Sequence, residues 1–202
     1  MDIRTLTGEN QERMEAELRE QFRGLDVFVW KSYTDGPEVT IFAAPVHQVY
    51  TFLQDVANNV CWLIDRNSTV KLKPDRYDRE QVLVVIRSYE PGAFIGWHGQ
   101  TLDAVELLLN AVVSQKLGLR LDITVDIDQY RKKRMSFLDS LIKRTVHDIE
   151  RDHQERPLPG LLSKERRHVH TALAEHPYLT TESRGRGSRR TLYIVPRKDL
   201  IT

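Results

Sequence analysis

The sequence contains a single cysteine and no long apolar run. Cys61 cannot form an internal disulfide or supply a Cys-x-x-Cys metal knuckle, which excludes a disulfide-stapled scaffold and a zinc ribbon. The longest aliphatic run, residues 82–86, is far shorter than the roughly 20 residues that a membrane span requires. The polar N-terminus is unlike a signal peptide. We therefore expect a cytoplasmic protein without membrane insertion.

The sequence also lacks the motifs of several enzyme classes. It has no Walker loop, no dinucleotide fingerprint and no nucleophile elbow, so the use of ATP or NAD and serine-type hydrolysis are unsupported. Asp122, Asp126 and Asp128 share one face of a predicted strand and are the only candidate metal ligands we identify, but no His-x-x-x-His or Cys partner completes the set. We expect no catalysis, no cofactor and no metal.

The two parts of this chain carry net charges of opposite sign. Of 202 residues, 40% are hydrophobic and 29% are charged, with a net charge of +1, as in ordinary globular proteins. Residues 1–128 carry 13 Lys and Arg against 20 Asp and Glu (net −7), whereas residues 129–202 carry 17 against 9 (net +8). A basic third is typical of a polyanion-binding module, although two oppositely charged domains that merely dock would show the same asymmetry.

Hydrophobic periodicity predicts an α+β protein of three small modules, residues 1–45, 46–128 and 129–202. The expected helices contain apolar positions three or four residues apart, and they include the stripes Met14, Leu18 and Phe22; Leu102, Val105, Leu109 and Val112; and Leu138, Leu141, Thr145 and Ile149. The expected strands are residues 25–33, 38–43, 69–72, 81–88, 121–127, 178–183 and 191–195. Pro157 and Pro159 should end the helix that contains Leu138, and Ser163 should cap the next helix, residues 164–175.

The glycine pair Gly96 and Gly99 encloses Trp97 and His98. The loop follows a helix and two strands and precedes a helix and a strand, which is the element order of a KH module. Glycines there let the backbone approach phosphates, and the unpaired amides at the start of the next helix attract an anion. A tight turn that only leads into the helix is the alternative.

In the basic third, Arg166 and His170 lie four residues apart on one helix face, where they could grip adjacent phosphates. Further arginines cluster at the following hairpin turn, at positions 184, 186, 189 and 190. The alternative is a solvated face, with Arg167 paired to Glu165 or Asp148. Of the run 131–134, we expect at least two residues to be solubilising charge.

Residues 94–104 (FIGWHGQTLDA) resemble the KH segment of the bacterial Jag family of RNA-binding proteins, also called SpoIIIJ-associated, EloR or KhpB proteins. Residues 163–170, 181–183 and 189–196 independently resemble that family's second module, which is named for its Arg-x-x-x-His signature. The resemblance covers about residues 46–198. Residues 1–45 resemble the family's N-terminal domain only in size and element order, because its usual Lys-Gly-x-x-Gly loop is missing.

The loop departs from the family pattern at one functional point. Family members usually carry two basic residues between the glycines, whereas this chain has Trp97 and His98. Trp97 could stack on a base, or its ring could fold back onto Phe94. His98 could donate to a phosphate, or it could simply be solvated.

From these observations we predict a non-catalytic protein that binds single-stranded RNA and acts as a post-transcriptional regulator. The expected contacts in the KH loop and groove are Ile95, Gly96, Trp97, His98, Gly99, Gln100, Thr101 and Leu102. Those in the C-terminal module are Arg166, Arg167, His170, Arg184, Arg186, Arg189 and Arg190. The resemblance implies a role in cell elongation, division and cell-wall homeostasis, and a small single-KH partner protein. The sequence leaves open whether the protein also binds single-stranded DNA and whether it forms a homodimer. The alternative function is an adaptor at the membrane-insertion or cell-wall machinery.

Overall fold

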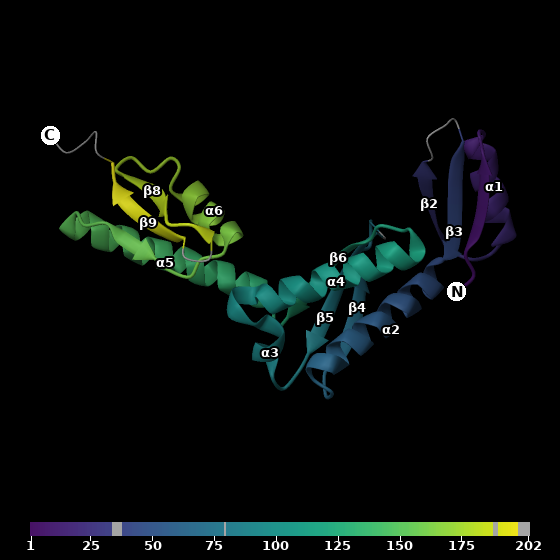
Figure 1. Cartoon of the computed structure of the whole chain (residues 1–202), viewed down its shortest axis with the longest axis horizontal. Coiled ribbons are helices and arrows are strands. Elements are labelled where there is room, and N and C mark those ends of the chain that lie inside the picture. Colours follow the sequence, from purple (N-terminus) through teal and green to yellow (C-terminus); the bar gives the residue numbers. More distant parts are fainter. Residues whose placement is uncertain (34–37, 79, 188–189, 198–202) are drawn as a thin grey trace. The chain divides into compact units, whose positions relative to one another are not determined.

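The computed structural model describes residues 1–33, 38–78, 80–187 and 190–197. Over these ranges the chain forms six α-helices and three three-stranded sheets, which confirms the mixture of helix and sheet predicted from periodicity. The chain divides into two compact units, residues 1–128 and residues 129–202 (Figure 1). None of the helices within the described ranges is both long and apolar enough to cross a membrane.

The first unit begins with a sheet covered by one helix. Its elements are β1 (Arg4–Gly8), α1 (Gln11–Gln21), β2 (Val27–Tyr33) and β3 (Val39–Pro45), and the antiparallel strand order is β1-β3-β2. Met14, Leu18 and Phe22 pack against Ile41 and Ala43 of the sheet, as the helical stripe predicted. The strand β1 was not predicted from the sequence, and β3 extends through Ala44 and Pro45. The predicted turn at 35–37 lies outside the described residues.

The rest of the first unit has two long helices on one face of a second sheet. Its elements are α2 (Val46–Ile64), β4 (Thr69–Pro74), β5 (Gln81–Arg87), α3 (Pro91–Ile95), α4 (Gln100–Leu117) and β6 (Asp122–Ile127). The strand order is β4-β5-β6, with β4 antiparallel and β6 parallel to β5. Leu53 of α2 and Leu109 of α4 are fully buried, as are Val84 and Val125 on the covered face of the sheet.

Three details of this region differ from the sequence predictions. Residues 73 and 74, which follow the predicted strand 69–72, extend β4, and the short helix α3 was not predicted. On α4 the fully buried position is Val113, whereas Val112 is only partly buried. A spacing of four residues from Leu109 to Val113 follows the helical repeat more closely than a spacing of three at this end of the stripe.

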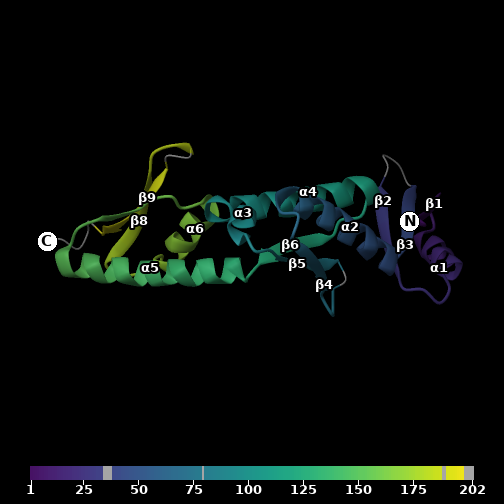
Figure 2. The ribbon, with the colours of Figure 1, turned by 90° about the horizontal axis from the view of Figure 1, so that it is seen from below.

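The second unit packs two helices against a small antiparallel sheet. Its elements are α5 (Tyr130–Asp152), β7 (Arg156–Leu158), α6 (Ser163–Ala172), β8 (Leu179–Arg184) and β9 (Thr191–Pro196), with strand order β7-β9-β8. The long helix α5 runs along the sheet (Figures 1 and 2). Leu138 and Ile149 of α5, Val169 of α6 and Ile194 of β9 belong to one apolar core.

Three sequence predictions for this unit were wrong in detail. The buried position on α5 is Ile142, and Leu141 packs only at the edge of the core. The residue before α6 is Leu162, so Ser163 is the first helical residue rather than its cap. Pro157 does follow the end of α5, but it lies in the short strand β7, which the sequence did not indicate.

Candidate nucleic-acid interface

The glycine loop is built from residues in the left-handed region of backbone conformation. Gly96 has φ 64° and ψ −162°, His98 has φ 53° and Gly99 has φ 90°. A Cβ atom on Gly96 would lie 2.0 Å from the Thr101 Oγ1 atom and 2.8 Å from its Cβ. Gly96 is therefore required by both its backbone angles and its packing.

The loop leads directly into α4, whose N-cap residue is Gly99. Glycine has no side chain, and no side-chain hydrogen bond caps this helix end. The first amides of an α-helix have no partner within the helix, and the helix dipole places partial positive charge at that end. The geometry thus brings Gly96, Gly99 and the exposed Gln100 to a helix terminus that suits an anion.

The two side chains between the glycines form a stacked pair. The rings of Trp97 and His98 have centroids 4.5 Å apart and are nearly parallel, at 12°. Trp97 is 65% exposed, whereas Phe94 is fully buried. The ring of Trp97 therefore stacks on His98, a partner that the sequence reasoning did not consider, and it remains accessible to a further aromatic ring.

Two other predicted loop residues serve the fold. Leu102 is 0% exposed and lies in the core of the first unit, as its place in the α4 stripe requires. Thr101 packs beneath Gly96. Ile95 is partly exposed at the end of α3, where it borders the loop.

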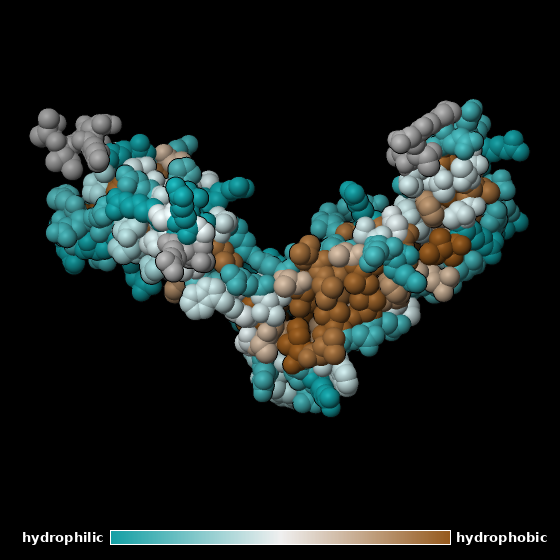
Figure 3. Space-filling view, in the orientation of Figure 1, coloured by the Kyte–Doolittle hydropathy of each residue, from teal (hydrophilic) through white to brown (hydrophobic). Residues whose placement is uncertain are grey.

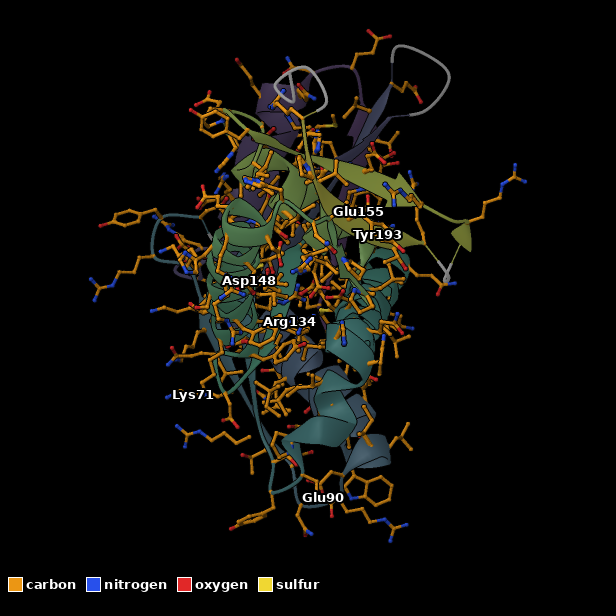
Figure 4. The ribbon with its side chains drawn as sticks, turned by 90° about the vertical axis from the view of Figure 1, so that its left-hand side faces the viewer. Lys71, Glu90, Arg134, Asp148, Glu155 and Tyr193 are labelled. Carbon is orange, nitrogen blue, oxygen red and sulfur yellow. The ribbon has the colours of Figure 1, made fainter. Side chains whose placement is uncertain are left out.

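The Arg-x-x-x-His helix of the second unit is anchored by a buried ion pair. The Glu165 side chain is 2% exposed; its Oε1 accepts a hydrogen bond from Arg134 Nε at 2.7 Å, and its Oε2 accepts one from the Leu162 N–H at 2.9 Å. Arg134, labelled in Figure 4, is itself only 18% exposed. One member of the basic run 131–134 is therefore structural. Glu165, an alternative partner for Arg167 on sequence grounds, binds Arg134.

Arg166 and His170 both lie on α6, and the structure shows what holds each side chain. Arg166 donates to the Leu161 carbonyl at 2.6 Å and to the Ser163 hydroxyl at 2.9 Å. The Nδ1 atom of His170 lies 2.7 Å from the Thr181 hydroxyl on β8. Thr181 belongs to the segment 181–183 that resembles the family's second module but was not predicted as a site residue; its position beside His170 now identifies it as one.

Arg184 is engaged by two carboxylates. It donates to both oxygens of Glu155, at 2.6 and 2.7 Å, and to Glu182 at 2.8 Å, and it lies 4.3 Å above the ring of Tyr193. Figure 4 labels Glu155 and Tyr193. The hydrogen bonds that Arg184 donates to Glu155 and then to Glu182 raise the pKa of Arg184, and the bond from Arg184 lowers the pKa of Glu155. A phosphate at Arg184 would therefore have to compete with two acids.

The remaining predicted arginines divide by exposure. Arg167, Arg186 and Arg190 are exposed, and Arg190 donates its backbone N–H to Gly187 near the hairpin turn. Arg189 lies outside the described residues. Within the described ranges, no three His, Cys, Asp or Glu side chains are grouped so that they could hold a metal ion.

Comparison with known proteins identifies the class of the C-terminal module. Residues 136–196 match the family model of the R-three-H domain, the domain named for the Arg-x-x-x-His signature. The matched range begins within α5, includes α6 and ends with β9. The predicted Arg-x-x-x-His module is thereby confirmed.

Three relatives bear the name RNA-binding protein KhpB. The protein of Clostridium symbiosum is 28% identical over 120 residues, which are 59% of this chain and 54% of that protein. The protein of Lactiplantibacillus plantarum is 29% identical over 107 residues, 53% of this chain and 33% of that protein. The protein of Bacillus subtilis is 28% identical over 152 residues, 74% of this chain and 70% of that protein. The chain spans about half the length of the curated relatives it matches.

Proposed function

We propose that this protein binds single-stranded RNA without catalysis, as a post-transcriptional regulator. The match to the R-three-H domain, the names of the relatives and the net charge of +8 over residues 129–202 support this function. A basic surface attracts the phosphate backbone because each neutralised phosphate releases condensed counterions. Cytoplasmic location and a role in cell elongation, division and cell-wall homeostasis belong to the same proposal.

Residues 46–128 serve in this proposal as a KH-type module. Support comes from the element order α2, β4, β5, α3, loop, α4, β6, and from the sheet order β4-β5-β6 in which only β6 is parallel to β5. The observation that carries the function is the loop 96–99 at the uncapped start of α4. Its glycines permit close approach of a phosphate, and the α4 amides provide donors for it.

The stacked pair Trp97 and His98 replaces the two basic residues that are usual in the family. An exposed indole offers a base roughly 1–3 kcal/mol of stacking free energy, which is independent of phosphate charge. The loop therefore combines backbone donors for a phosphate with an aromatic surface for a base. His98 supports the indole from one side and leaves the other accessible.

The second unit supplies an additional RNA-binding surface around α6. Arg167 and Arg186 are exposed, and Arg166 and His170 lie one helical turn apart. Two weak sites on one chain strengthen each other, because binding at one raises the effective RNA concentration at the other.

The test compares two substitutions at His98 of the 202-residue chain, to side chains that are isosteric with each other. Asn and Asp both tolerate the left-handed backbone of this residue, so the variants His98→Asn and His98→Asp differ mainly by one negative charge. A charge about 5 Å from a phosphate costs about 1–3 kcal/mol, so His98→Asp should bind a labelled 12-nucleotide RNA pool about 5- to 150-fold more weakly than His98→Asn. Fluorescence anisotropy measures both affinities, and circular dichroism checks the fold.

Equal affinities of the two variants would show that no phosphate lies at this loop. Absence of RNA binding by the unmodified protein would favour an adaptor that recognises a protein, such as a small single-KH partner. Running the matched DNA pool in parallel decides whether the 2′-hydroxyl contributes, since only RNA carries it.

A further inference from the structure

The long helix α5 carries a row of basic and polar side chains on the side opposite its buried face. The buried face consists of Leu138, Ile142, Thr145 and Ile149. At about 100° per residue, seven residues lie within about 50° of the opposite direction around the helix axis. All seven are exposed, and they form what we call the α5 row: Lys133, Ser136, Ser140, Lys143, Arg144, His147 and Arg151. The row contains four Lys or Arg residues and neither an acidic nor an apolar one.

The α5 row faces away from the elements that pack against this helix. Figures 1 and 2 show α6, β8 and β9 on one side of α5, and these elements share the apolar core that its buried face enters. In Figure 3 the visible face of the second unit is mostly hydrophilic, whereas the broad hydrophobic surface belongs to the first unit. A partner of the α5 row is therefore polar or charged rather than an apolar segment.

The four acidic residues of α5 all lie outside the row. Each of them has a basic or histidine side chain close to it. The pairs are Asp139 with His168, Asp148 with Arg151, Glu150 with His176 and Asp152 with Arg156. Three of these partners belong to segments that follow α5 in the chain. The negative charge of the helix is thus directed toward its flanks, and its outward side is positive.

The cations of the row differ from the predicted site arginines in having few internal contacts. Lys133, Lys143 and Arg144 make no side-chain hydrogen bond or ion pair within the part of the chain that the structure describes. By contrast, Arg166 donates to the Leu161 carbonyl, and Arg184 is bound by two carboxylates. A phosphate at the α5 row therefore displaces no internal partner, because these charges are solvated.

We propose that the α5 row binds the phosphate backbone of single-stranded RNA, as a site separate from the glycine loop and from α6. This inference rests on the proposed function. The row extends about 27 Å from Lys133 to Arg151, at 1.5 Å per residue, so several phosphates fit along it. It has no Trp, Tyr or Phe on which a base would stack, so its contacts are independent of sequence. It also lacks the apolar side chains with which a helix enters a membrane surface.

The first experiment measures how the affinity of the 202-residue chain for RNA depends on salt. Fluorescence anisotropy follows a labelled pool of single-stranded RNA about 30 nucleotides long. The variant combines Lys133→Gln, Lys143→Gln and Arg144→Gln. Each lost phosphate contact lowers the magnitude of the salt slope by about 0.7, so the three substitutions should lower it by about 2 and weaken binding on the order of 100-fold at about 0.1 M salt. Glutamine is a good helix former, and circular dichroism checks the fold.

The matched control removes the same charge from the first unit. It combines Arg13→Gln, Arg19→Gln and Arg23→Gln, at three exposed positions in or next to α1, and it should leave the slope nearly unchanged. Equal changes in both triple variants would show a diffuse effect of total charge and overturn the α5 site alone. If the unmodified chain bound no RNA, the proposed function would fail and the α5 site with it. If the α5 variant lost binding to phosphatidylglycerol vesicles but kept its RNA affinity, the row would belong to a membrane surface instead.

The second experiment adds a charge to the row. Ser140 lies between Lys133 and Arg144, and its hydroxyl donates only to the Ser136 carbonyl of the same helix. Ser140→Lys should raise the magnitude of the salt slope by about 0.7 and strengthen binding about 5-fold at about 0.1 M salt. The matched control, Ala16→Lys at an exposed position of α1, should change neither. Impaired folding cannot produce a gain in affinity, so unchanged binding by Ser140→Lys would overturn the proposal.

Discussion

The ion pair between Glu165 and Arg134 should be the largest single electrostatic contribution to the stability of the second unit. Removing one member of a buried pair costs about 3–5 kcal/mol, because the other charge stays buried without its counterion. Arg134 is 18% exposed and lies 5.3 Å from the ring of Phe137, so its guanidinium keeps some favourable contacts. We therefore expect Glu165→Gln, which keeps an oxygen for the Leu162 N–H, to cost about 2–3 kcal/mol.

Urea unfolding can resolve this effect because of where the tryptophans lie. Trp30, Trp62 and Trp97 are all in the first unit, so tryptophan emission reports on that unit alone, whereas far-ultraviolet circular dichroism reports on both. With a slope of about 1–2 kcal/mol per molar urea, Glu165→Gln should lower the midpoint of the second unit by roughly 1–3 M. The midpoint followed by tryptophan emission should not change.

The matched control is the exposed ion pair of the same unit. Glu155→Gln removes one of the two carboxylates that bind Arg184, and since Glu155 and Arg184 are both nearly half exposed, the cost should be about 0–1 kcal/mol. If Glu165→Gln shifted the midpoint no more than Glu155→Gln, burial would not be the property that makes the Glu165 pair strong, and the reasoning would be refuted.

Three further predictions follow from individual side chains. Trp97→Ala should weaken RNA binding by about 1–3 kcal/mol while leaving the dependence of the affinity on salt unchanged, and an altered salt slope in anisotropy titrations would argue against stacking. Arg166→Ala should weaken binding to all RNA sequences alike and reduce the magnitude of the salt slope by about one unit; an unchanged slope would assign this arginine to the fold. The hydrogen bond from Ser88 lowers the pKa of Asp65, so the carboxylate stabilises the folded state above the ordinary value of about 3.9, and this contribution is lost as pH falls through the lowered pKa. In the variant Asp65→Asn, the urea midpoint of unfolding should therefore fall less steeply below about pH 4 than in the unmodified protein. An equally steep fall in both proteins would contradict this account.

Elements with a long apolar repeat could be predicted from the sequence. The helix predicted from the stripe that begins at Leu102 is α4, and the predicted strand 121–127 is β6, with Ile123, Val125 and Ile127 buried. Periodicity succeeds in these elements because several apolar residues of one element indicate the same buried face. The short elements β1, α3 and β7 carry too few residues for a repeat, and they depend on pairing or packing with distant segments.

The candidate site divides in the same way. The sequence by itself determined the glycine loop, the helix that follows it and the Arg-x-x-x-His spacing, because these depend on residues that are neighbours along the chain. Only the tertiary structure decided which charge meets which: Arg134 binds Glu165 and Arg184 binds Glu155, across 31 and 29 positions. Any of 30 basic side chains could pair with any of 29 acidic ones, and only packing of the backbone selects the few pairs within hydrogen-bond distance.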